Sequence, residues 1–255
     1  MHKGKGVSFF RNALYIVSHI FFSYFNRQTN NVISMYIVSF ISLLSIFVLS
    51  PLIPLYSAPA DSTDVHQLWF DCKLEGVISY EVFNTAYRGY RRIDNLKKKN
   101  LITIIDYSLP STETRLFVID LGNRNLLIKC LVAHGKNSGE NFANSFSNDP
   151  RSLKSSLGFF VTGETYNGEN GYSLKLDGLE KNINDNARTR EIVIHGADYV
   201  SERYISRYGR LGRSWGCLAV PPEILKELVD KISGGSCLFI YADDKSYKEN
   251  SAFMK

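Results

Sequence analysis

Several signatures of common hydrolytic and metal sites are missing from this chain. It has neither His-Glu-x-x-His nor Cys-x-x-Cys, so the usual zinc-binding spacings are absent and we expect no metal and no cofactor. Ser-x-x-Lys and Lys-Thr-Gly are also absent, which excludes the serine site of penicillin-binding proteins. Gly212-Arg213-Ser214-Trp215-Gly216 matches the serine elbow of α/β-hydrolases, but that site requires a later histidine and no histidine follows Ser214.

Acidic residues are missing from the N-terminal part. Four basic residues and no acidic ones precede Asp61, whereas the whole chain holds 30 basic and 25 acidic residues. The net charge of +5 therefore comes almost entirely from Lys3, Lys5, Arg11 and Arg27. The rest of the chain is nearly balanced, so it has no electrostatic footprint for nucleic acid and we expect no nucleic-acid partner.

A long uncharged stretch, residues 32–56, follows these basic residues. It is long enough to span a bilayer core of about 30 Å at roughly 1.5 Å per residue. Two interpretations remain open: an uncleaved membrane anchor, or a signal peptide cleaved near the small residues 57–60. We favour the anchor because the stretch exceeds an h-region of about 7–15 residues; a buried core helix rarely runs this long without a polar face. The preceding basic residues would stay in the cytoplasm, so we expect the body to be exported, in the periplasm or at the extracytoplasmic face of the inner membrane.

The distribution of apolar residues predicts four parts. Residues 1–60 form the basic segment with the anchor or signal peptide, 61–77 a connector, 78–245 a folded domain and 246–255 a tail. Helical periodicity predicts a helix over 78–96, and a proline start with a Gly-Gly end predicts another over 222–232. Short apolar runs separated by turns predict an α+β, β-rich fold, a sandwich or barrel with a few flanking helices. The predicted strands cover 101–107, 115–121, 126–133, 159–162, 172–176, 191–195 and 237–241, and 137–148 reads as a long loop.

The most informative segment begins with His195-Gly196 and ends with Ser214-Trp215-Gly216-Cys217. A cysteine thiolate is a strong nucleophile, and a neighbouring imidazole can take its proton. Gly216 lets the backbone turn sharply, so that nearby amides can point at a developing oxyanion. Ser214 either stabilises this turn or donates to a substrate. The alternative is structural: a buried cysteine and a histidine whose nitrogens are satisfied in the core. If Cys217 is a free nucleophile, at most one disulfide can form among the remaining cysteines, Cys72, Cys130 and Cys237.

The same segment resembles the signature of YkuD-type L,D-transpeptidases: His-Gly, a spacer, then Ser-x-Gly-Cys. It is most similar to the murein L,D-transpeptidase catalytic domain family, a divergent branch. The resemblance extends from about residue 83 to residue 241. Besides 209–217, it includes residues 107–108, 116–121, 132–139, 146–148, 155–159, 163–166 and 171–174. Trp215 is typical of this branch, whereas Leu218 occupies a place where proline is more usual.

The resemblance implies a role for each site residue. Cys217 corresponds to the acylated nucleophile and His195 to its base, and the amides of Gly216 and Cys217 correspond to the oxyanion donors. Gly196, Gly216 and Ser214 support the turns. Three further residues are candidates for substrate contact, each with structural packing as its alternative: His134, Arg213 and Tyr166.

The resemblance also implies a reaction on peptidoglycan stem peptides. A Cys thioester would be resolved by an amine of a second stem, giving 3→3 cross-links, and carbapenems would inhibit the enzyme. The same site would serve an L,D-carboxypeptidase or an amidase that cuts a lipoprotein tether. A catalytically silent wall-binding module, held at the membrane, is the alternative of another class.

Overall fold

The computed structural model describes residues 64–255. The predicted anchor or signal peptide, with the rest of residues 1–60, lies outside this range. Among the described helices, none is long and apolar enough to span a bilayer.

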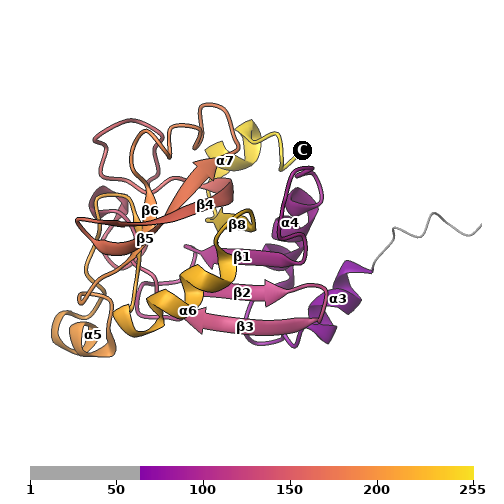
Figure 1. Ribbon diagram of the computed structural model, residues 1–255, viewed down its shortest axis with the longest axis horizontal. Coiled ribbons are helices and arrows are strands. Elements are labelled where there is room, and N and C mark those ends of the chain that lie inside the picture. The colour runs from indigo at the N-terminus through magenta and orange to yellow at the C-terminus, as the bar shows by residue number, and fades with distance from the viewer. Residues whose placement is uncertain (1–63) are drawn as a thin grey trace, which may run out of the picture. The chain divides into compact units, whose positions relative to one another are not determined.

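The strands of the described residues form one mixed sheet in the order β3-β2-β1-β8-β4-β5-β6-β7 (Figure 1). Neighbouring strands are antiparallel except for the parallel pairs β1–β8 and β6–β7. The strands are β1 (Leu101–Asp106), β2 (Leu116–Asp120), β3 (Asn125–Cys130), β4 (Gly158–Gly168), β5 (Gly171–Gly178), β6 (Val193–Gly196), β7 (Leu218–Val220) and β8 (Cys237–Tyr241).

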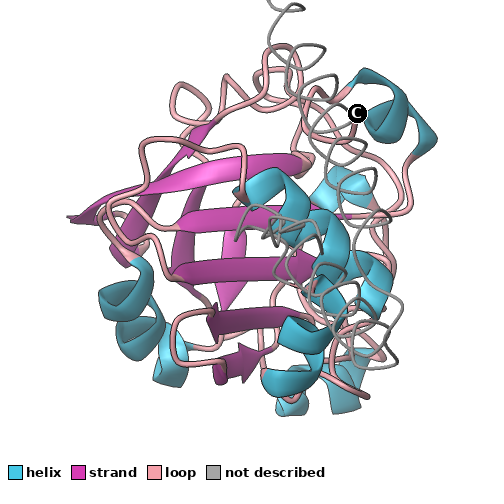
Figure 2. Ribbon diagram, turned by 90° about the vertical axis from the view of Figure 1, so that its right-hand side faces the viewer, coloured by secondary structure: helices cyan, strands magenta, loops and turns pink. Residues whose placement is uncertain are grey.

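The sheet curls until its two edges meet. Beyond β3, the Ala133 N–H donates to the carbonyl oxygen of Ala219 in β7 (2.8 Å), although β3 and β7 are the opposite edge strands. Figure 2 shows the strands as a curved layer with most helices gathered along one side. The predicted β-rich fold with few helices is confirmed, but the strands do not divide into the two stacked sheets of a sandwich. The parallel β1–β8 pair joins both halves into one sheet.

Two helices cover the sheet through apolar faces. Helix α4 (Tyr80–Tyr90) begins at Ser79, whose hydroxyl accepts from the Val82 N–H, and it buries Val82, Phe83 and Ala86. Helix α6 (Pro222–Ile232) has proline in its first turn and buries residues including Leu228 and Val229. The prediction for 222–232 is confirmed. The helix predicted over 78–96 is shorter, because the chain turns after residue 90.

The predicted connector and tail are both packed into the fold. Within 61–77 lies helix α3 (Val65–Asp71), which is capped by the Asp64 side chain, packs on α4 and buries Leu68. Within 246–255 lies most of α7 (Lys245–Asn250), after which Phe253 stacks on Phe159 with ring centroids 4.9 Å apart. Such packing was not predicted, because short apolar patterns are too weak to indicate it unless the surface that covers them is known.

Two further elements have no counterpart among the predicted ones. Helix α5 (Glu202–Tyr208) buries no residue, although Ser201 caps its start and Gly209 ends it in the left-handed region. Strand β7 has only three residues and forms by parallel pairing with β6. All four cysteines lie in the described part of the chain and all are free thiols, so none of the possible disulfides is formed.

Candidate active site

The β6–β7 pair places Cys217 beside β6. In this parallel pair Ile194 is opposite Leu218 and His195 is opposite Ala219. Cys217 precedes β7 by one residue and so lies level with Val193, on a strand about 4.8 Å away. Since side chains alternate along a strand, Val193 and His195 share a face. Cys217 and His195, far apart in sequence, are thereby brought to neighbouring positions on adjacent strands.

The contacts of Cys217 favour the neutral thiol. The thiol donates to the carbonyl oxygen of Glu191 (3.3 Å). Burial raises the pKa of the Cys217 thiol, and the Val193 backbone N–H and the Arg190 charge counteract this only in part. Cys217 therefore begins as a thiol, and a base is needed to generate the thiolate.

His195 has the tautomer that a general base requires. Its Nδ1 lies 3.0 Å from the carbonyl oxygen of Gly196, and because a carbonyl only accepts, Nδ1 carries the proton. The lone pair is then on Nε2. Burial lowers the pKa of His195, so the ring stays neutral at neutral pH. His195 and Cys217 are not hydrogen-bonded to each other in this arrangement, which corresponds to a thiol beside a neutral imidazole and not to an ion pair.

The turn before Cys217 depends on Gly216 and Ser214. Gly216 has φ +124°, and a Cβ there would lie 2.9 Å from the carbonyl oxygen of Lys154 and 3.0 Å from Ile192 Cδ1. The Ser214 hydroxyl donates to the Cys217 carbonyl oxygen (2.7 Å) and accepts from the Gly216 N–H (3.1 Å). The geometry therefore favours the turn-stabilising role for Ser214. It also means that the Gly216 amide, expected as an oxyanion donor, points at Ser214 in this arrangement.

His134 is buried at 1% exposure, with both ring nitrogens bonded. Nδ1 accepts from Arg115 Nη2 (2.9 Å), since a guanidinium only donates, and Nε2 then donates to the carbonyl oxygen of Gly139 (3.3 Å). Burial, assisted by the charge of Arg115, lowers the pKa of His134 to about 4. This arrangement favours the structural alternative for His134. Its backbone carbonyl accepts from the Ser214 N–H (3.0 Å), which ties it to the Cys217 turn.

Sequence reasoning missed Arg115, which is fully buried beneath this turn. Its guanidinium donates to the carbonyl oxygens of Val132 (2.7 and 3.0 Å) and Leu109 (3.0 Å), and it lies 4.8 Å from the centroid of the Tyr107 ring. Burial lowers the pKa of Arg115 to about 10. The only signal in the sequence is a basic residue that begins an apolar run, and such residues are usually solvated strand ends.

Comparison with known families decides the assignment. The sequence model of the L,D-transpeptidase catalytic domain matches residues 74–241, about two thirds of the chain. This chain belongs to the L,D-transpeptidase catalytic domain family. The match begins before the predicted domain start at residue 78 and includes every strand described above.

Solved structures of L,D-transpeptidases are similar to this L,D-transpeptidase domain at low identity. One from Mycobacterium smegmatis is 14% identical, with a TM-score of 0.36, over 56% of this chain and 59% of that one. Pgp2, the helical cell shape determining protein of Campylobacter jejuni, is 16% identical, with a TM-score of 0.39, over 60% and 49%. LdtMt1 in complex with imipenem is 16% identical, with a TM-score of 0.34, over 56% and 59%. This chain thus spans less than two thirds of each. A search of curated proteins found no match.

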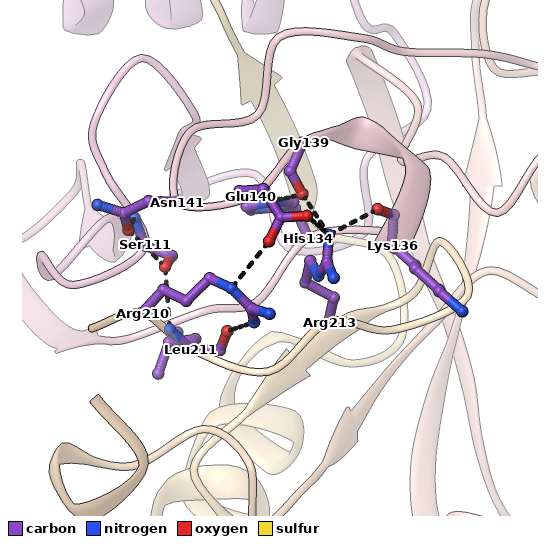
Figure 3. Close-up of polar contacts among 9 residues, drawn as sticks. All are labelled: Ser111, His134, Lys136, Gly139, Glu140, Asn141, Arg210, Leu211 and Arg213. Atoms are coloured by element: carbon purple, nitrogen blue, oxygen red, sulfur yellow. Dashed lines mark hydrogen bonds and ion pairs between the residues drawn. The ribbon is translucent and has the colours of Figure 1, made fainter. Parts of the chain in front are cut away.

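Two of the predicted substrate-contact residues are linked to the candidate active site, Tyr166 through the sheet and Arg213 along the chain. Tyr166 on β4 is paired with Ser173 on β5, which is paired with His195, so the three form one row across the sheet. Arg213 directly precedes Ser214, and its Nη1 donates to the side chain of Glu140 (2.7 Å) (Figure 3). Trp215, between Ser214 and Gly216, is 77% exposed.

The remaining site features are structural. Gly196 packs against α6, because a Cβ there would lie 3.1 Å from Leu225 Cδ2 and 3.3 Å from Pro222 Cα. Within residues 64–255, no group of three or more His, Cys, Asp or Glu side chains is arranged to hold a metal ion.

The opposite pKa shifts of Cys217 and His195 predict a pH profile. Because the thiol pKa is raised, alkylation of Cys217 by iodoacetamide should keep increasing above about pH 8.5, the ordinary thiol pKa. His195→Gln should leave this alkylation profile almost unchanged but slow acylation by a carbapenem at neutral pH by about 10²-fold, since it removes the base. Intact mass measured against time and pH tests both. An alkylation midpoint below about pH 7 would instead indicate a preformed thiolate–imidazolium pair.

Proposed function

We propose that this protein is a cysteine acyltransferase of the cell wall, an L,D-transpeptidase that forms 3→3 cross-links between peptidoglycan stem peptides. One observation carries the proposal: the parallel register of β6 and β7 puts Cys217, which directly precedes β7, level with Val193 on the strand that carries His195. The Nε2 of His195 is left to accept a proton, because Nδ1 carries one. A nucleophile and a base on adjacent strands are what thiol acyl transfer requires. Membership of the L,D-transpeptidase family supplies the substrate class.

The reaction proceeds in two steps through the same pair. Cys217 Sγ attacks the carbonyl carbon that joins the third residue to D-Ala while its proton passes to His195 Nε2. The C–N bond then breaks, and the leaving D-Ala amine takes the proton from His195. An amine of a second stem attacks the thioester, a C–N bond forms, the C–S bond breaks, and the amine's proton returns to the sulfur through His195. The free thiol is regenerated, so no redox reagent is consumed.

Hydrolysis is the nearest competitor, since water can replace the acceptor amine at the thioester. A carboxypeptidase would then release tripeptides, and an amidase would cut a lipoprotein tether. Cys217 does not form the disulfide that would have favoured a silent wall-binding module. We further propose that residues 1–60 direct the domain out of the cytoplasm and hold it at the membrane, where its substrate lies.

Incubation of the full-length protein with a disaccharide-tetrapeptide distinguishes these activities. We expect dimers that have lost one D-Ala and are linked through the third residues of both stems, identified by tandem mass spectrometry. Tripeptide monomers without dimers would establish hydrolysis and refute transfer. No change in the muropeptide, in the presence of an added acceptor stem, would refute both.

A further inference from the structure

The side chain of Glu140 lies between two guanidinium groups beside the candidate active site (Figure 3). Its Oε1 is 2.7 Å from Arg213 Nη1, and its Oε2 is 3.0 Å from Arg210 Nε. Each carboxylate oxygen is therefore ion-paired with a different arginine, and Oε1 also accepts a hydrogen bond from Arg213. Two positive charges face one negative charge, so the cluster retains a net positive charge.

The arginines are fixed in the fold, whereas the carboxylate is on its surface. The side chains of Arg213 and Arg210 are 18% and 25% exposed, but that of Glu140 is 71% exposed. Arg213 Nη1 also donates to the carbonyl oxygens of Lys136 (3.2 Å) and Gly139 (3.0 Å), and Arg210 Nη1 donates to that of Leu211 (2.7 Å). If Glu140 swung into solvent, both guanidinium groups would stay in place.

The two guanidinium groups also have unused donors. A guanidinium has five N–H donors. Arg213 uses only Nη1, so its Nε and Nη2 have no acceptor among the described residues. Arg210 donates from Nη1 and holds Nε in an ion pair with Glu140, and its Nη2 has no acceptor in the same part of the chain. Partly buried, forked donors of this kind match the geometry of a carboxylate.

The loop that carries Glu140 is anchored independently of these ion pairs. The next residue, Asn141, accepts from the Ser111 N–H through its carbonyl oxygen (2.8 Å), and its Oδ1 accepts from the Ser111 hydroxyl (2.8 Å). The Ser111 hydroxyl in turn accepts from the Leu211 N–H (3.1 Å). Release of the Glu140 side chain therefore need not release the loop.

The cluster lies close to the Cys217 turn. Arg213 is joined directly to Ser214, whose hydroxyl bonds the carbonyl of Cys217. Cys217 is four positions after Arg213, so their Cα atoms cannot be more than about 14 Å apart even in an extended chain. A stem peptide held at Cys217 can therefore place a carboxylate against the guanidinium groups of Arg210 and Arg213.

We propose that Arg210 and Arg213 form a carboxylate-binding subsite for the peptide substrate, and that Glu140 occupies this subsite in the free protein as a built-in competitor. The identity of the peptide as a stem rests on the proposed function. On binding, the substrate carboxylate replaces that of Glu140 on the same donors, and Glu140 turns into the solvent to which it is already largely exposed. Affinity for the substrate is thereby set by an exchange of one carboxylate for another.

Equilibrium binding tests the exchange without requiring turnover. The probe is the tetrapeptide L-Ala-γ-D-Glu-L-Lys-D-Ala, with its carboxylates free or amidated, titrated calorimetrically into full-length Cys217→Ala protein. Adding Glu140→Gln should tighten binding of the free-acid peptide about fivefold, as expected for loss of an exposed competing ion pair, and leave the amidated peptide unchanged. Arg213→Gln should weaken only the free-acid peptide, and singly amidated peptides identify which carboxylate binds. Glu169→Gln, at an exposed glutamate in the β4–β5 turn, is the matched control and should change neither affinity.

Two results would overturn the proposal. Glu140→Gln and its parent could have equal affinities for the free-acid peptide while hydrogen exchange in residues 137–148 becomes faster. That result would mean that Glu140 only stabilises the loop. If Glu140→Gln raised the affinity for the amidated peptide by the same factor, carboxylate exchange would be excluded. If Arg213→Gln fails to fold, Glu140→Gln alone decides. Failure of the muropeptide reaction, with the carboxylate effect intact, would refute the proposed function and leave the subsite standing.

Discussion

Replacing Cys217 with alanine should eliminate the reaction, lowering the rate of cross-link formation by more than about a thousandfold. The thiol is the only group in the proposed mechanism that bonds to the acyl carbon, so no neighbouring residue can substitute for it. The variant should also form no covalent adduct with imipenem, the carbapenem bound in the LdtMt1 complex. Intact mass after exposure to imipenem and the muropeptide assay measure the two effects separately.

A matched control shows that the effect belongs to this thiol. Cys130→Ala removes a buried thiol whose pKa burial raises even further from the physiological range, so it should retain the imipenem adduct while losing some stability. Cys217 is only partly buried, and Cys217→Ala should melt within a few degrees of the parent. An imipenem adduct that persists in Cys217→Ala would show that another residue is the nucleophile and would refute the assignment.

Replacing Arg115 with methionine should destabilise the domain by about 3 kcal/mol or more. Methionine has a similar length but no donor, so the carbonyls of Val132 and Leu109 and the Nδ1 of His134 lose their partners in a site without solvent. Each buried polar group left unpaired costs about 1–3 kcal/mol. Relief of the buried charge offsets part of this cost, since burial already disfavours the charged guanidinium. Because several acceptors are lost at once, the penalty should outweigh the relief.

Chemical denaturation measures this difference, and Arg188→Met provides the contrast. Arg188 forms ion pairs with Glu164 and Asp177, but all three side chains are well exposed, so its replacement should cost less than about 1 kcal/mol. Arg115 forms no ion pair among the described residues, but its replacement should nonetheless cost more free energy of unfolding than that of Arg188. If Arg115→Met and Arg188→Met had equal free energies of unfolding, the donors of Arg115 would be dispensable.

Loss of Arg115 should also disturb the turn before Cys217. Arg115 fixes the carbonyl of Val132 and the ring of His134, and the His134 carbonyl accepts from the Ser214 N–H. We therefore expect a variant that still folds to be acylated more slowly by imipenem than its stability alone explains. Arg115→Lys keeps a charge without the planar fork and should restore little of either property.

Elements with strong local signals could be predicted from the sequence. Proline and the Gly-Gly pair bracket α6, and the apolar spacing within it matches its buried face, so its predicted bounds are those observed. Alternation and turn residues located seven of the strands to within a few residues, except that β4 runs beyond the predicted 159–162. His195 and Cys217 stay the predicted catalytic pair: chain order excluded the serine elbow, and the resemblance to L,D-transpeptidases selected the two residues.

Which segments meet could not be predicted from local patterns and is known from the folded structure. Strand β7 exists because β6 pairs with it, and the single curled sheet, in place of a sandwich, follows from the β1–β8 pair and the Ala133–Ala219 bridge. The burial of Arg115 and the ion pairing of Glu140 likewise depend on residues distant in sequence. A side chain's burial, and hence its pKa and the strength of its hydrogen bonds, is set by the segments packed around it, and a linear pattern of residues does not carry that information.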